Sequence, residues 1–395
     1  MIEFGINSSN IEENHISSIY LDYQASTPLD PRVLNVMLPY LTEKYGNPHS
    51  TEHSFGWISN DGVEKAKAQV ASYINSLEDE IIFTSGSTEA NNLAIIGIGY
   101  AALEKSNRRK ILISPIEHKC VLGASRFLAR FGFIIEKLPV ESDGLIDIEK
   151  FKSRLKDDVL LVSVMSTNNE IGVNEPVVTI GQLCHEKGIL FHIDASQGAY
   201  TNLDVLNTSA DFMSLSAHKI YGPKGIGSLY ISQSASLKPI PIINGGGQQD
   251  GYRSGTLPTF LAVGMGEACS IMQEVKETEA GILKVLRDKL CIGLLKIFPN
   301  AKLNGHSQER HPGNLNLTIP GIDSKQLILS LQPNIAFSTG SACTSGIIEP
   351  SHVLKAIGLS TVDTDSSFRM SVGRFSTEDE ILKALTIIRN YKTLQ

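Results

Sequence analysis

Short apolar runs alternate with longer amphipathic stretches through most of the chain after residue 18. Apolar or β-branched runs bounded by turn residues predict strands, and amphipathic stretches predict helices. We expect strands at residues 81–84, 110–114, 133–137, 159–165, 190–194, 212–216 and 227–231, and helices at 59–76, 89–102, 121–130, 147–155 and 180–187. This alternation predicts a mostly parallel, doubly wound α/β sheet, whose chemistry lies beyond the carboxyl ends of its strands.

The pattern changes after residue 261. A long helical stretch covers 261–297, which we expect Gly264, Gly266 and Gly281 to interrupt. Short strand-like runs follow at 315–318, 335–338 and 368–371. Strands and helices in this looser order predict a smaller α+β domain of about 120 residues. The first 18 residues are polar and predict a loosely ordered arm. The expected division is an N-terminal arm over 1–28 that joins the small domain, a large domain over 29–265 and the small domain over 266–395.

The composition argues against several classes of protein. Hydrophobic residues make up 42% of the 395 residues and charged residues 19%, which excludes a wholly disordered chain. A net charge of −7 without a basic stripe argues against a nucleic-acid-binding module. No apolar run reaches the roughly 18–20 residues of a membrane span, and the polar N-terminus lacks the features of a signal peptide.

The five cysteines are widely spaced and form no CxxC pair. They are Cys120, Cys184, Cys269, Cys291 and Cys343. This spacing predicts neither a zinc site nor a disulfide framework, so we expect no bound metal and a reducing, cytoplasmic location. Four of the thiols are expected to be ordinary, small buried side chains.

Two polar residues stand where predicted strands end. Lys219 follows the run 212–216, and a lysine beside apolar structure can act as an amine nucleophile. A solvated loop lysine is the commoner interpretation of Lys219 alone. Asp194 ends the run 190–194, where a buried carboxylate needs a cationic partner such as a protonated pyridine nitrogen. The alternative for Asp194 is an ordinary helix N-cap.

A turn rich in glycine and hydroxyl groups joins the first predicted strand to the next helix. Ser87 and Thr88 lie there and are followed by Glu89. Free N–H groups and the helix dipole at such a turn can bind phosphate. A capping box explains the same residues and is compatible with a phosphate site. A phosphate cradle, an acid and a lysine, each at a strand–helix junction, are together a much stronger signal than each alone.

These motifs resemble those of the cysteine desulfurases of the NifS/IscS type, within the class-V aminotransferase family of fold-type I pyridoxal phosphate enzymes. Matching stretches occur in the family's order at residues 20–28, 45–48, 84–92, 117–119, 168–172, 192–194, 218–225, 253–256, 338–343 and 369–374. The resemblance implies the pyridoxal phosphate-dependent transferase fold of type I. Its large domain would hold a mostly parallel seven-stranded sheet, beside a smaller α+β domain, and the protein would be a homodimer.

The resemblance also implies roles for single residues. Lys219 matches the lysine that binds pyridoxal 5′-phosphate, and Asp194 matches the partner of its pyridine nitrogen. His118 matches the histidine that stacks on the ring and moves protons. Further cofactor contacts are implied for Gln197 and Asn169 near the phenolate and for Ser87, Thr88, Ser216, His218 and Thr256 at the phosphate, with Thr256 donated across the dimer interface. Asn169 and Arg369 match residues near the substrate carboxylate, for which a bidentate guanidinium is suited.

Cys343 determines the reaction that the resemblance implies. It lies among small residues and glycines over 337–346, which predict a mobile loop, and its thiol needs a nearby proton acceptor for activation. Without the resemblance, a buried thiol in a turn explains Cys343 equally well. With it, Cys343 matches the nucleophile that takes sulfur from L-cysteine as a persulfide, releases L-alanine and passes the sulfur to an acceptor protein. The segment resembles that of the group with a long, flexible cysteine loop.

Rival functions remain open at this point. An aminotransferase or a selenocysteine lyase would use the same fold, and a non-catalytic assembly subunit would keep the fold without the chemistry. The sulfur could serve iron–sulfur clusters, tRNA thiolation or DNA phosphorothioate modification. Few residues follow Arg374, without the longer C-terminal extension of iron–sulfur desulfurases, and this resembles the DndA-like branch that serves DNA modification. We expect no direct contact with nucleic acid or with a membrane.

Overall fold

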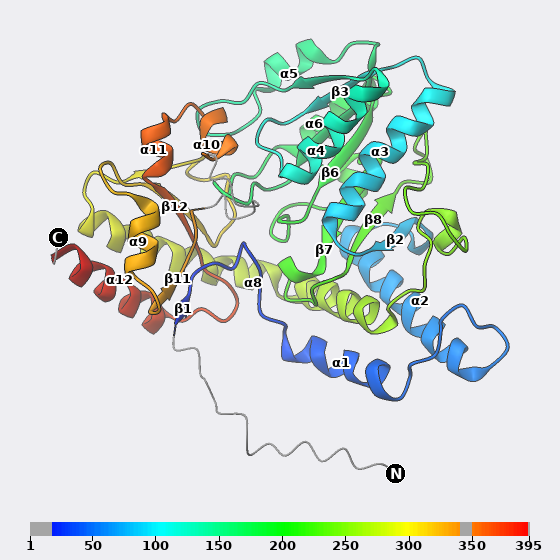
Figure 1. The fold of residues 1–395 in the computed structure, drawn as a ribbon, viewed down its shortest axis with the longest axis horizontal. Coiled ribbons are helices and arrows are strands. Elements are labelled where there is room, and N and C mark those ends of the chain that lie inside the picture. The colour runs from blue at the N-terminus through cyan, green and yellow to red at the C-terminus, as the bar shows by residue number, and fades with distance from the viewer. Residues whose placement is uncertain (1–17, 340–349, 394–395) are drawn as a thin grey trace.

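The computed structural model describes residues 18–339 and 350–393 (Figure 1). Its largest sheet has seven strands in the order β2-β8-β7-β6-β5-β3-β4. They are β2 (Ile81–Thr84), β3 (Lys110–Ile113), β4 (Ile134–Lys137), β5 (Val159–Met165), β6 (Leu190–Asp194), β7 (Phe212–Ser216) and β8 (Gly227–Ile231). β8 runs antiparallel to β2 and β7, and all other neighbouring pairs are parallel. The expected mostly parallel seven-stranded sheet is confirmed, and its strands start and end within one residue of the expected bounds.

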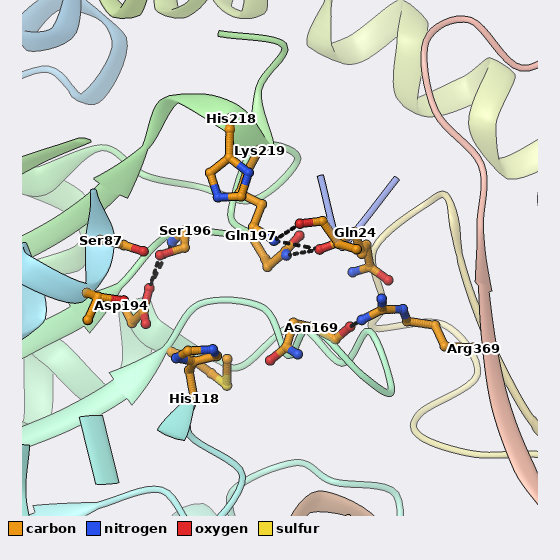
Figure 2. A pocket seen from close by; sticks show the side chains of 13 residues that line it. Gln24, Ser87, His118, Asn169, Asp194, Ser196, Gln197, His218, Lys219 and Arg369 are labelled. Atoms are coloured by element: carbon orange, nitrogen blue, oxygen red, sulfur yellow. Dashed lines mark hydrogen bonds between the residues drawn. The ribbon is translucent and has the colours of Figure 1, made fainter. Parts of the chain in front are cut away.

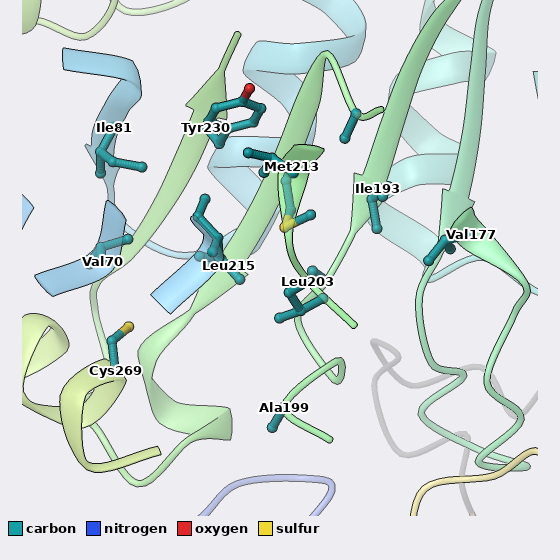
Figure 3. Packing of buried hydrophobic residues seen from close by; sticks show 14 of the residues in the cluster. Val70, Ile81, Val177, Ile193, Ala199, Leu203, Met213, Leu215, Tyr230 and Cys269 are labelled. Carbon is teal, nitrogen blue, oxygen red and sulfur yellow. The ribbon is translucent and has the colours of Figure 1, made fainter. Parts of the chain in front are cut away.

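Helices cover both faces of this sheet. They are α1 (Pro31–Thr42), α2 (Ser54–Ile74), α3 (Ser87–Lys105), α4 (Lys119–Leu128), α5 (Ile148–Arg154), α6 (Val177–Glu186), α7 (Val205–Thr208) and α8 (Thr259–Ile297), with 3-10 turns η2 (Glu78–Glu80), η3 (Ala129–Phe131), η4 (Ala217–Lys219) and η5 (Gln249–Gly251). Side chains alternate along a strand, so Phe212 packs toward α3 and α4. Its neighbour Met213 packs toward α2 and α8 on the other face of the sheet (Figure 3). Strands that are buried on both faces appear in the sequence as continuous apolar runs, and this makes them predictable.

The C-terminal part forms a second, smaller core. It contains the antiparallel strands β12 (Ser367–Ser371), β10 (Asn314–Thr318) and β9 (Lys302–Leu303), the strand β11 (Ile335–Ala336), and the helices α9 (Ser324–Ser330), α10 (His352–Ala356), α11 (Thr361–Asp365) and α12 (Glu378–Thr393). β1 (Ile19–Tyr20) pairs in parallel with β11. The first described residues of the chain therefore pack against this smaller core. The expected combination of a large, mostly parallel sheet and a smaller α+β part is confirmed.

The long helix α8 runs through both cores without a break. A Cβ on Gly264 would lie 2.6 Å from Met37 Sδ, and one on Gly266 would lie 2.5 Å from Gln69 Oε1. These glycines therefore let α1 and α2 pack closely against α8 instead of interrupting it. The predicted domain boundary between residues 265 and 266 lies inside this helix, and the division into domains stays a prediction.

None of the helices in residues 18–339 and 350–393 combines the length and the apolar character that crossing a lipid bilayer requires. Two sequence-based expectations concern segments beyond these residues. The loosely ordered arm over the first residues and the Cys343 segment both lie outside the described residues.

The side chain of Arg374 joins three parts of the fold. Its Nη1 donates to Asp30 Oδ2 at 2.8 Å, just before α1, and its Nε donates to Glu279 Oε2 at 2.9 Å in α8. Its guanidinium lies 4.0 Å from the ring centroid of Tyr221. The Glu279 side chain is only 8% exposed, so removal of Arg374 would leave a buried carboxylate without this cation.

We expect Arg374→Leu to lower the free energy of unfolding by about 3 kcal/mol, because it breaks a buried ion pair from one side. The exposed pair between Arg154 and Glu136 is the matched control, and Arg154→Leu should cost less than about 1 kcal/mol. Urea-induced unfolding of the cofactor-free chain, followed by circular dichroism, measures both. Equal losses in the two variants would contradict this role of Arg374.

Candidate active site

A cavity of about 240 Å³ lies at the carboxyl edge of the large sheet, where doubly wound sheets place their chemistry (Figure 2). His118 caps the start of α4, Asp194 ends β6, Lys219 ends η4 and Arg369 lies in β12. The full lining is Gln24, Ala25, Ser87, Thr88, His118, Met165, Asn169, Asp194, Ser196, Gln197, His218, Lys219 and Arg369. The fold therefore brings most of the residues selected from the sequence to one place.

Asp194 presents a buried carboxylate to this cavity and is 3% exposed. Asn91 Nδ2 donates to its Oδ2 at 2.7 Å, and the backbone N–H of Ser196 donates to its Oδ1 at 3.0 Å. The Ser196 hydroxyl also donates to Oδ1. All three donors are neutral, so none of them neutralises the carboxylate. A cationic group of a ligand would find strong stabilisation here.

Lys219 enters the cavity directly after β7. Its Nζ donates to the backbone carbonyls of Gln24 at 2.7 Å and Ala25 at 2.8 Å. The Nε2 of Gln197 donates to the same Gln24 carbonyl at 2.8 Å. The N-terminal segment thus orients two of the predicted cofactor residues through its backbone (Figure 2).

A second cavity adjoins the first at the start of α3. Its lining includes Ala25, Ser26, Gly86, Ser87, Thr88, Ser216, His218, Lys224 and Gly225. Gly86 precedes the helix with φ of +149° and gives no side-chain cap, so first-turn N–H groups stay available to a ligand. A Cβ on Gly227 would lie 2.8 Å from Gly86 Cα, so glycine lets β8 lie close to this turn. A helix N-terminus in this state suits a phosphate group.

His118 lies on the wall of the first cavity. Its Nδ1 accepts the backbone N–H of Cys120 at 3.2 Å, so a neutral ring carries its proton on Nε2. Burial lowers the pKa of His118 below its usual value. The negative charge of Asp194 raises this pKa, and the positive charge of Lys219 lowers it. His118 is therefore neutral at pH 7, with Nε2–H as its donor and Nδ1 as its acceptor.

Arg369 lies at the end of the cavity that faces β12 and is 3% exposed. Its Nη2 donates to Asp22 Oδ1 at 2.6 Å and to Ser338 Oγ at 3.0 Å, and its Nη1 donates to the Asn169 carbonyl at 2.6 Å. Its Nε has no hydrogen-bond partner among the described residues. Arg369 is thus fixed in position and retains a donor for a carboxylate ligand.

Three predicted site residues lie outside the first cavity or outside the described residues. Ser216 lines the second cavity, beside Ser87 and His218. Thr256 lines a separate cavity with Tyr45, away from both cavities of its own chain. A contact of Thr256 with the cofactor phosphate bound in a second chain remains a prediction. Cys343 lies outside the described residues, and its predicted role also remains a prediction.

Sequence reasoning gave no role to four polar residues that shape the site. Asp22 and Gln24 contact Arg369 and Lys219, and Asn91 and Ser196 donate to Asp194. Asp22 and Arg369 are 347 positions apart, so their pairing follows from the fold and not from local spacing. The only signal in the sequence is that Asp22, Gln24 and Asn91 fall inside the motif stretches 20–28 and 84–92.

Comparisons with known proteins agree with this geometry. The family model "Aminotransferase class-V" matches residues 19–383. A protein of Rickettsia bellii named cysteine desulfurase IscS is 46% identical over 376 residues, which is 95% of this chain and 91% of the relative. A solved NifS-like protein has a TM-score of 0.89 and 32% identity, and the match covers 96% of this chain and 100% of that one. The solved DndA from Streptomyces lividans has a TM-score of 0.75 and 35% identity, with coverage of 88% and 97%.

These matches confirm the resemblance inferred from the motifs. Several cover nearly the whole chain, so the family is shown for the chain as a whole and not for one segment. The chain belongs to the class-V aminotransferase family and, within it, to the cysteine desulfurases.

Proposed function

We propose that Cys343 takes the sulfur of L-cysteine as a persulfide, that L-alanine leaves, and that an acceptor protein then receives the sulfur. The observation that most supports this proposal is the convergence of Lys219, Asp194, His118 and Arg369 on one cavity at the strand ends. Four groups that such a reaction needs line this cavity. They are an acid, an amine, a proton carrier and a group that binds a carboxylate.

The two adjoining cavities fit pyridoxal 5′-phosphate. The buried carboxylate of Asp194 accepts from neutral donors among the described residues and would face the ring nitrogen, and the open helix N-terminus of α3 would hold the phosphate. The residues proposed to hold the cofactor are Ser87, Thr88, His118, Asn169, Asp194, Gln197, Ser216, His218 and Lys219, with Thr256 from a second chain. When bound, this cofactor supplies an electron-withdrawing ring that stabilises negative charge on substrate carbon.

Residues of the chain perform the remaining steps. Arg369, fixed by Asp22, would bind the substrate carboxylate and set the position of the amino acid. The amine of Lys219 would carry protons to and from the substrate, and His118 would take part through Nε2, the nitrogen that carries its proton. His218 accepts from or donates to Ser26 Oγ at 3.2 Å through its Nδ1, which fixes the ring beside the phosphate cradle.

The sulfur transfer balances without an external oxidant or reductant. The Cys343 thiolate supplies the electron pair of the new S–S bond to the substrate sulfur. The C–S bond of L-cysteine breaks, and its electron pair stays with the β-carbon. A proton delivered by His118 or Lys219 then completes L-alanine, while the sulfur remains on Cys343 as a persulfide.

We propose an acceptor protein and not a nucleic acid as the direct recipient of the sulfur, because the chain is acidic, with a net charge of −7. The described cysteines are free thiols, which suits a cytoplasmic enzyme. Identity is 46% with the IscS relative and 35% with DndA, so the comparisons give no preference for the DndA-like branch. The pathway stays a prediction among iron–sulfur, tRNA and DNA modification.

We also propose a homodimer through the surface of α1 and the start of α2. Large apolar side chains are exposed there: Leu34, Leu38, Leu41, Tyr45, Phe55, Trp57 and Ile58. Leu34, Leu38 and Leu41 recur on one face of α1, and the rings of Tyr45 and Phe55 lie 5.5 Å apart. Exposed apolar side chains grouped in this way are characteristic of a protein interface. Thr256 lines a cavity beside Tyr45, so a second chain docked here would place Thr256 near the interface.

Replacement of Cys343 tests the proposed nucleophile. We expect Cys343→Ala to reduce alanine release from L-cysteine more than about 100-fold, because no thiolate remains to accept the sulfur. Binding of pyridoxal 5′-phosphate, followed by visible absorption, should not change. Cys291→Ala, in α8, is the matched control and should retain activity. Undiminished alanine release by Cys343→Ala would refute the proposal.

Hybrid dimers test the exchange of Thr256 between chains. Lys219→Ala and Thr256→Asp homodimers should both be nearly inactive, the second because its carboxylate repels the phosphate. A hybrid of the two chains would contain one native site, so we expect roughly half of the wild-type activity per dimer. Differently tagged, co-expressed chains allow the hybrid to be purified. A hybrid as inactive as its parents would mean that Thr256 acts within its own chain.

A further inference from the structure

A continuous series of hydrogen bonds connects the carboxylate of Asp194 with the imidazole of His118. Asn91 Nδ2 donates to Asp194 Oδ2 at 2.7 Å and to Cys120 Sγ at 3.2 Å. Cys120 Sγ in turn lies 3.0 Å from His118 Nδ1. Asn91 and Cys120 do not line the cavity and have no role in the proposed function.

The direction of each hydrogen bond follows from the chemistry of the groups. An ionised Asp194 only accepts, so the amide nitrogen of Asn91 must face it, and the second N–H of that nitrogen reaches Cys120. His118 Nδ1 already accepts a backbone N–H, so the thiol is the donor in its contact with the ring. Burial raises the pKa of the Cys120 thiol to about 12, which keeps the S–H proton in place.

Rigid helices hold both linking residues. Asn91 is fully buried in α3, four residues after Ser87 of the phosphate cradle, so one helix carries both groups on the same face. Cys120 lies in the first turn of α4. A Cβ on Gly99 in α3 would lie 2.5 Å from Leu128 Cδ2 in α4, which shows how closely the two helices approach.

We propose that Asn91 and Cys120 are positioning residues of the desulfurase reaction, which hold the Asp194 carboxylate and the Nε2–H tautomer of His118 in one fixed mutual geometry. The inference rests on the proposed roles of Asp194 and His118 in the cofactor site. Asp194 would set the electronic state of the cofactor while His118 moves protons beside it. A shared hydrogen-bond series aligns the two groups without a contact between them.

Replacement of Asn91 tests its link to Asp194. We expect Asn91→Leu, which keeps the volume, to weaken the binding of pyridoxal 5′-phosphate by about tenfold, because the carboxylate loses one of its three donors. Asn92→Leu is the matched control, since Asn92 in the same helix only donates to the Thr88 carbonyl at 2.7 Å. Its dissociation constant should equal that of the wild type. Equal dissociation constants in the two variants would overturn the role of Asn91.

Replacement of Cys120 tests its link to His118 in the cofactor-free chain. A donor to Nδ1 favours the neutral ring, so Cys120→Val should raise the pKa of His118 by about half a unit, and Cys120→Ser should restore the wild-type value. The ¹⁵N chemical shifts of the imidazole follow this titration, assigned by their loss in His118→Gln. The charged and titratable groups around the ring, Asp194, Lys219, Lys119 and His352, are the same in all variants.

The same variants carry a kinetic signature. The acidic limb of kcat should follow the pKa of His118, so it should move to higher pH in Cys120→Val but not in Cys120→Ser. Identical titrations of the valine and serine variants would overturn the role of Cys120, whether or not Asn91→Leu folds. A wild-type chain that bound no pyridoxal 5′-phosphate would instead refute the proposed function, and the NMR titration would still decide the link between Cys120 and His118.

Discussion

The site depends on one buried carboxylate, which accepts hydrogen bonds from neutral donors. Asp194 is held at the end of a central strand by an amide, a backbone N–H and a hydroxyl. Such a group is costly to bury as an ion unless a cation joins it. The cavity beside it is therefore matched to a ligand with a protonated ring nitrogen, and the lysine amine and open helix N-terminus nearby fit the rest of the same ligand.

The fold assembles this site from both ends of the chain. The carboxyl edge of the parallel sheet provides the acid, the amine and the histidine, as the topology of doubly wound sheets dictates. The end of the cavity that we propose binds the substrate instead comes from β12, where Asp22 of the N-terminal segment fixes Arg369. Pairing of β1 with β11 places that N-terminal segment against the second core. The position of Arg369 relative to the sheet thus depends on the packing of the two cores, which α8 and Arg374 join.

Much of this could be predicted from the sequence because the signals were local. The strand Val159–Met165 is an apolar run with both faces buried, and its bounds were predicted without error. Long-range contacts were not predictable. The two-residue strand β1 is too short to carry a pattern, the predicted run 335–338 gives no sign of its partner β1, and Asp22 gives no sign of Arg369. The packing of Gly264 against Met37 was also hidden, since a glycine in a helical stretch signals equally an interruption or a close contact.

The most direct measurement compares the affinity of the wild-type chain for pyridoxal 5′-phosphate with its affinity for the analogue in which C–H replaces the ring nitrogen. The account predicts that the analogue binds at least about tenfold more weakly, because it cannot place a positive N–H against the Asp194 carboxylate. The proposed phosphate cradle and Lys219 would contact both molecules in the same way, so the difference would report on Asp194 alone. Equal affinities would contradict the central claim that this buried carboxylate exists to pair with the ring nitrogen of the cofactor.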